Sequence, residues 1–198
     1  VFMGRLGWTV AALCVLYTAF HIAVMNGVHD RITDLLGIAS IDLTEPWRYR
    51  LIHVAGGLAL GFLLFSSRGT SGRDTAVPVN PVEMALLALG GAGIVIATGQ
   101  LGLMWATGDL IATGAPATKH LWTFGYPLAI GTTLALLASW VAPPRPKGQF
   151  GVADGLLALA AITVGAYIIL HAGWLRTRAQ VFPHPNDMWA SIMGIVLI

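Results

Sequence analysis

Five polar side chains in this apolar chain have types and positions that could do chemistry. His21, His53, His120 and His171 lie near the ends of four different apolar segments, and Gln100 lies late in another. When the segments are threaded back and forth through a membrane, all five fall in the same half of the bundle. Paired imidazoles can serve as axial ligands of haem, and an imidazole can also bind a pigment such as bacteriochlorophyll. Because the opposite half has no histidine, at most one haem or one pigment site is compatible with this pattern.

A plainer interpretation of these histidines is that they hydrogen-bond headgroups, loops and water at the membrane surface. We therefore expect no cofactor, with histidine ligation kept as an alternative. The spacing of the single cysteine and the histidines matches no metal site, so no metal is expected. Nucleophile motifs, paired carboxylates and phosphate-binding loops are absent from the sequence, so we expect no catalytic residue and no enzyme.

The composition decides the class of protein that must position these side chains. Of 198 residues, 56% are hydrophobic and only 10% charged, against about 25% charged in an ordinary soluble domain. This predicts an all-α, polytopic transmembrane helix bundle that forms a single membrane domain, residues 1–198. The net charge of +2 includes no basic run, so nucleic acid is not an expected partner, whereas membrane lipids are.

Hydropathy predicts five full spans and the start of a sixth, with a short interfacial helix between the first two. The expected spans are about 7–26, 50–66, 82–106, 122–141, 152–173 and, incomplete, 188–198. The last apolar run is too short to cross a core of roughly 30 Å, so we expect its helix to continue beyond Ile198.

Small residues at helical spacing predict where the helices pack. His53, Gly57 and Gly61 recur every four residues and share one face of the second span. Ala161 and Gly165 form a second such pair in the fifth span. Glycine and alanine let helix backbones approach closely in membranes, so these faces are expected to contact another helix of this chain or of a partner.

Two stretches resemble a known family. The first is RLIHVAGGLALGFLLF, which opens with Arg50, Ile52 and His53. The second is ADGLLALAAITVGAYIILHAGWLRTRAQ followed by PNDMWASIMGIVLI; its matching positions are Asp154, Leu157, Tyr167, Arg178, Asp187 and Gly194. Together they resemble the fused permeases of tripartite ATP-independent periplasmic (TRAP) transporters, in the branch served by TAXI-type binding proteins.

The resemblance implies a small, Q-like membrane domain and not a complete transporter. Two departures matter: residues 78–144 insert two further spans, and the large transport domain with its substrate and sodium sites is not in this chain. The implied partners are a large transport (M-like) domain and a periplasmic binding protein. The implied location is the bacterial inner membrane with a cytoplasmic N-terminus, while Lys and Arg, which divide almost evenly between the faces, do not decide the orientation.

Three functions follow as hypotheses. The first is a scaffold domain of a TRAP-type transporter, in which Arg50 and His53 anchor the bundle at the headgroup boundary and bind no transported substrate. The second is an accessory subunit of a larger respiratory or photosynthetic membrane complex that has lost transport. The third is a haem- or pigment-binding membrane protein.

Overall fold

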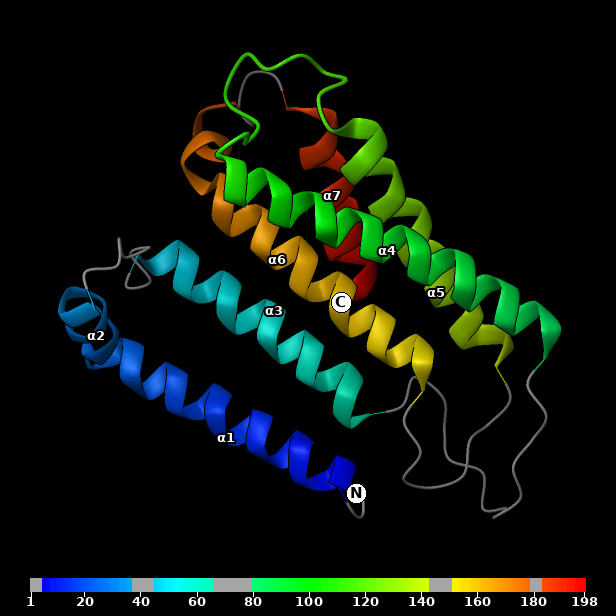
Figure 1. Cartoon of the computed structure of the whole chain (residues 1–198), viewed down its shortest axis with the longest axis horizontal. Helices are drawn as coiled ribbons and strands as arrows, with labels where there is room; N and C mark the ends of the chain where they lie inside the picture. Colours follow the sequence, from blue (N-terminus) through cyan, green and yellow to red (C-terminus); the bar gives the residue numbers. More distant parts are fainter. Residues whose placement is uncertain (1–4, 37–44, 66–79, 143–150, 179–182) are drawn as a thin grey trace.

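A computed structural model describes residues 5–36, 45–65, 80–142, 151–178 and 183–198. Every regular element within these ranges is helical (Figure 1). The elements are α1 (Arg5–Met25), α2 (Val28–Leu36), α3 (Pro46–Leu64), α4 (Pro81–Thr107), the π-helical turn η1 (Leu121–Gly125), α5 (Tyr126–Val141), α6 (Val152–Arg178) and α7 (Pro185–Leu197).

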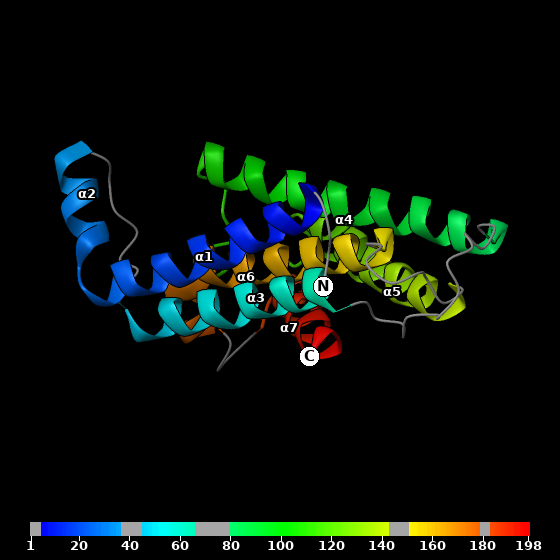
Figure 2. The same ribbon diagram turned by 90° about the horizontal axis from the view of Figure 1, so that it is seen from below.

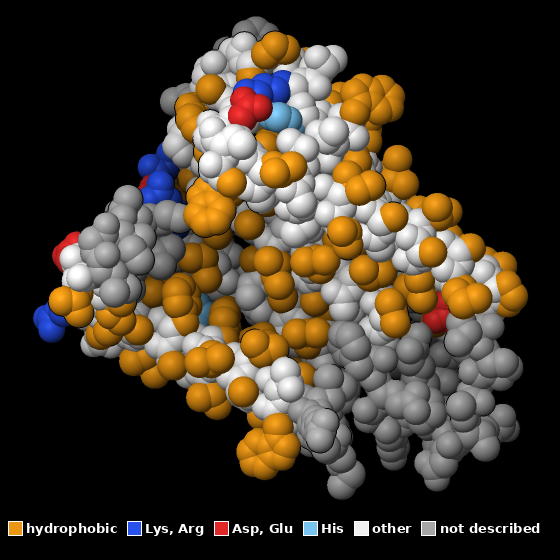
Figure 3. All heavy atoms as spheres, in the orientation of Figure 1, with side chains coloured by type: hydrophobic (Ala, Val, Ile, Leu, Met, Phe, Trp, Pro, Cys, Tyr) orange, Lys and Arg blue, Asp and Glu red, His pale blue; other side chains and the backbone are white. Residues whose placement is uncertain are grey.

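Four helical segments of the described chain are long and apolar enough to cross a membrane. They are Gly7–Met25, Pro81–Thr107, Leu121–Val141 and Val152–Arg176. The chain is therefore an all-helical protein with the character of a membrane protein. Apolar side chains spread over the helices in Figure 3, while charged side chains gather near the helix ends.

The expected second and sixth spans do not reach this standard. Helix α3 begins at Pro46, so its first turns contain Arg48 and Arg50, and it ends at Leu64. Its charge-free part, residues 51–64, is about 21 Å long, short of a core of roughly 30 Å. Helix α7 has only 13 residues. Five full spans plus a sixth thus stay a prediction, as does the interfacial position of the short helix α2.

The helices form a bundle in which α6 is central. It packs against α3 on one side and against α4, α5 and α7 on the others. Helices α4, α6 and α3 lie side by side in Figure 1, with α5 beside α4 and α1 outermost. The view in Figure 2 places α7 on the side of the bundle away from α4. The buried core lies where α4, α5, α6 and α7 meet.

Glycines bring α4 and α5 into backbone contact. A Cβ added to Gly131 would lie 2.7 Å from the Ile94 nitrogen, and one added to Gly93 would lie 2.7 Å from the Pro127 oxygen. At Gly90 the distance to the Ala135 nitrogen would be 2.9 Å. Real Cβ atoms cannot approach backbone so closely, so these positions need glycine.

Helix α3 packs extensively on α6, whereas the outermost helix, α1, attaches through few contacts. Gly165 of α6 lies directly against Ala55 of α3, and Gly56 of α3 lies directly against the Tyr17 ring of α1. Much of α1 has no neighbour within the described chain, and Trp8 is 80% exposed. In a membrane such a surface faces lipid or a partner protein.

Candidate functional site: a polar cap at one end of the bundle

The main cluster of buried polar side chains, which we call the polar cap, joins the end of α6 to the start of α7. It consists of Tyr167, His171, His184, Asn186 and Asp187, all buried. The Tyr167 hydroxyl donates to Asp187 Oδ1 over 2.5 Å. The Tyr167 ring lies between two others, with centroids 4.7 Å from Phe124 and 4.2 Å from His171.

Local sequence explains how α7 begins. His184 is the N-cap, Pro185 occupies the first helical position, and Asp187 Oδ2 accepts the His184 backbone N–H over 3.1 Å. Proline and a carboxylate in the first turn both favour a helix start. The His184 Nδ1 accepts the Asn186 backbone N–H over 3.2 Å. Nε2 therefore bears the proton, which it donates to the Pro116 oxygen over 2.9 Å.

His171 is also held at both ring nitrogens. Its Nε2 accepts the Ile111 backbone N–H over 3.2 Å, so Nδ1 donates to the Tyr167 oxygen over 2.8 Å. In this arrangement neither nitrogen has a lone pair free for a metal or pigment. His171 instead ties the 108–120 connection to α6.

Asn186 explains why Gly125 has no side chain. Its Nδ2 donates to the Lys119 backbone oxygen over 2.9 Å, while its buried Oδ1 has no hydrogen-bond partner within the described chain. A Cβ at Gly125 would lie 2.3 Å from that Oδ1. The asparagine amide therefore fills the space that a larger residue at 125 would need.

A more exposed group, the cap rim, borders the polar cap. Gln100 Nε2 donates to His120 Nδ1 over 3.1 Å, and His120 Nε2 lies 3.1 Å from the Asp109 carboxylate. Lys119 Nζ is 2.6 Å from Asp109 Oδ1. The hydrogen bond from Lys119, with the charge of Lys119 and the hydrogen bond from His120, holds the pKa of the Asp109 carboxyl below its usual range.

His21 and His53 form a separate pair between α1 and α3. Their Nε2 and Nδ1 atoms are 3.4 Å apart, and Tyr17 donates its hydroxyl to the His53 backbone oxygen over 2.6 Å. The Tyr49 ring meets His21 edge-on. The five polar residues singled out in the sequence thus divide into three groups: this pair, the Gln100 and His120 pair, and His171.

Among the described residues, no three His, Cys, Asp or Glu side chains converge as metal ligands. The remaining motif residues are dispersed. Arg50 is exposed near the start of α3, whereas Asp154 is buried in the first turn of α6, where a carboxylate favours the helix N-terminus. The side chain of Arg178 lies outside the described residues.

The structure places the packing residues unevenly. Ala161 and Gly165 are buried on α6. A Cβ at Gly57 would reach only the Tyr17 hydroxyl, at 4.0 Å, and one at Gly61 would meet nothing within 4 Å. Contact of Gly57 and Gly61 with an outside helix therefore stays a prediction.

Two features escaped the sequence-based reasoning. The crossing at Gly90, Gly93 and Gly131 had a signal in the small-residue spacing of its two helices. The role of His184 and Asn186 had a signal in the residue order His, Pro, Asn, Asp, which is a helix-capping pattern.

No family model, no curated protein and no solved structure matches the chain.

Proposed function

We propose that the chain is a membrane scaffold domain of the small, Q-like type found in TRAP permeases, and that it holds a larger transport domain in place. The main support is the bond between Tyr167 and Asp187. These two residues belong to the motif on which the resemblance rests, and they bind each other inside the fold. Motif residues that join α6 to α7 stabilise the packing of these helices, which suits a domain with a structural role.

The outer surface supports the same proposal. Large apolar side chains along α1 are exposed, among them Trp8 and Met25. A membrane-embedded face of this kind offers a partner domain extensive contact without polar groups that need satisfying. By contrast, transported substrates bind at mid-membrane polar sites in secondary transporters. Most polar side-chain atoms of the cap are instead hydrogen-bonded within the fold, Asn186 Oδ1 excepted.

Co-purification tests the proposal. The chain is expressed in the bacterial inner membrane together with a TRAP transport domain, and with the periplasmic binding protein of that transporter. The N-terminus of the chain is on the cytoplasmic side in this proposal. We expect a stable complex, and transport that depends on it. Arg50→Ala and His53→Ala should leave substrate affinity nearly unchanged. Loss of substrate binding by His53→Ala with the complex intact would contradict the scaffold role.

The second candidate is an accessory subunit of a larger membrane complex. The observation in its favour is that α4 and α5 lie within residues 78–144, which the TRAP family lacks, and yet supply much of the buried core. An added hairpin so deeply integrated suits a domain adapted to a different partner. Purification from native membranes tests this: co-purifying respiratory or photosynthetic subunits would replace the transporter proposal.

The third candidate, a haem or pigment protein, has weaker support. A haem held between two imidazoles has its macrocycle between the rings, whereas the His21 and His53 rings contact each other directly. His171 has both nitrogens in hydrogen bonds. These residues do not fit a shared haem. A visible absorption spectrum of the purified protein tests the matter, and a haem or chlorin band would revive this candidate.

A further inference from the structure

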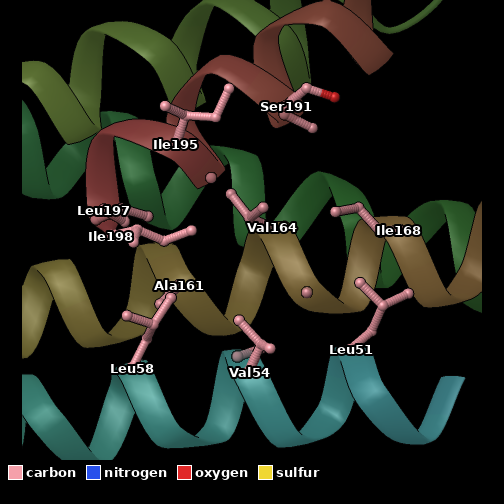
Figure 4. Close-up of a pocket in the computed structure, with 14 residues that line it drawn as sticks. Leu51, Val54, Leu58, Ala161, Val164, Ile168, Ser191, Ile195, Leu197 and Ile198 are labelled. Atoms are coloured by element: carbon pink, nitrogen blue, oxygen red, sulfur yellow. The ribbon is translucent and has the colours of Figure 1, made fainter. Parts of the chain in front are cut away.

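A narrow apolar groove runs between α3, α6 and α7 (Figure 4). Its volume is about 200 Å³. Leu51, Val54 and Leu58 line it from α3, with Val164 and Ile168 opposite them on α6. An apolar cavity of this size stays dry and accepts small apolar groups.

The groove continues along α3. A shallower hollow lined by Gly57, Gly61 and Phe65 shares Leu58 with it. From Leu51 to Phe65 the path is about 21 Å at 1.5 Å per residue, and half of a bilayer's hydrocarbon core is about 15 Å. One lipid acyl tail therefore fits the length.

A positive charge lies at the polar end of the groove. Arg50 precedes Leu51 and stands four residues, or one helical turn, before Val54, so it shares the groove-lining face of α3. It is exposed and has no hydrogen-bond or ion-pair partner within the described chain. By contrast, Arg48 and Arg176 both pair with Glu45. A guanidinium in this position matches a phosphate at headgroup level.

We propose that the groove binds one anionic phospholipid, with its phosphate on Arg50 and one acyl tail along α3 between α6 and α7. The lipid covers apolar surface that the described helices leave open. It also lies against Gly57 and Gly61, whose bare backbone leaves room for the chain. This site does not depend on whether the protein is a transporter scaffold.

The experiment is a titration of the full, delipidated chain in detergent with phosphatidylglycerol, followed by native mass spectrometry. Phosphatidylcholine with the same tails serves as the headgroup comparison. Val54→Trp fills the groove, and its control is Val95→Trp, a similarly exposed valine on α4. Arg50→Gln removes the charge, and its control is Arg31→Gln, an exposed arginine on α2.

We expect one tightly retained phosphatidylglycerol per chain and weaker retention of phosphatidylcholine. Arg50→Gln should weaken binding about fivefold, the usual effect of one cation at a membrane surface. Val54→Trp should weaken it at least tenfold, and both controls should bind as the wild type does. If Val54→Trp does not fold, Ser191→Trp blocks the groove from α7 instead.

Two results would overturn the proposal. One is equal phosphatidylglycerol binding by the groove variant and its control. The other is a groove variant that changes the oligomeric state or a protein complex while lipid binding stays constant, which would make the groove a contact for a protein segment.

Discussion

The bond between Tyr167 and Asp187 makes the structural role of the polar cap measurable. Tyr167→Phe removes one hydroxyl and keeps the ring between Phe124 and His171. It leaves the buried Asp187 carboxylate without the donor at 2.5 Å. Depriving a buried acceptor of its partner costs about 1–3 kcal/mol. For a chain of this length each kcal/mol shifts the melting temperature by about 2–4 °C, so Tm should fall by about 2–12 °C.

Thermal unfolding in detergent, followed by circular dichroism, measures this change. Tyr126→Phe is the control, because the Tyr126 hydroxyl has no hydrogen-bond partner within the described chain and its ring contacts remain. Its Tm should change by less than about 2 °C, as for a substitution with no named mechanism. A double-mutant cycle with Asp187→Ala, which removes the acceptor, isolates the pairwise term, which should be at least about 1 kcal/mol.

Two outcomes would refute the reasoning. If Tyr167→Phe melted like Tyr126→Phe, the buried bond would contribute no stability. If Tyr167→Phe abolished substrate binding in an assembled transporter while Tm stayed constant, the pair would belong to a substrate site and not to the scaffold.

Two further predictions concern other parts of the fold. Gly131→Leu forces α4 and α5 apart and should lower the free energy of unfolding by at least about 3 kcal/mol or prevent folding. The control is Gly99→Leu, which should melt near the wild type because an added Cβ there meets nothing within 4 Å. Equal melting of the two variants would mean that the helices do not cross at Gly131. Because its pKa is lowered in the folded state, Asp109 stabilises the fold when the pH is above the ordinary pKa range of a carboxyl. This stabilisation is lost as the pH falls through the pKa of Asp109 in the folded state. Lys119→Gln should therefore reduce the drop in Tm between pH 6 and pH 3; an unchanged drop would assign the acid sensitivity to other groups.

The sequence by itself determined the helices, because their signals are local. Apolar length predicted α1, α4, α5 and α6, since a hydrocarbon core requires long uncharged segments. A capping residue also marks the start of α4, where the Asn80 side chain accepts the Val82 N–H. These signals act within a few residues of each other, so no neighbouring helix is needed to recognise them.

Tertiary structure alone decided which polar groups meet. The histidines share one end of the bundle in the sequence pattern, yet His171 bonds to Ile111 while His21 meets His53. Which side chain finds which partner depends on the rotation and crossing of whole helices. Close backbone contacts set these, such as the contact of Gly131 on α5 with Ile94 on α4. Sequence spacing specifies the face of a helix on which a residue lies, but only packing specifies what that face touches.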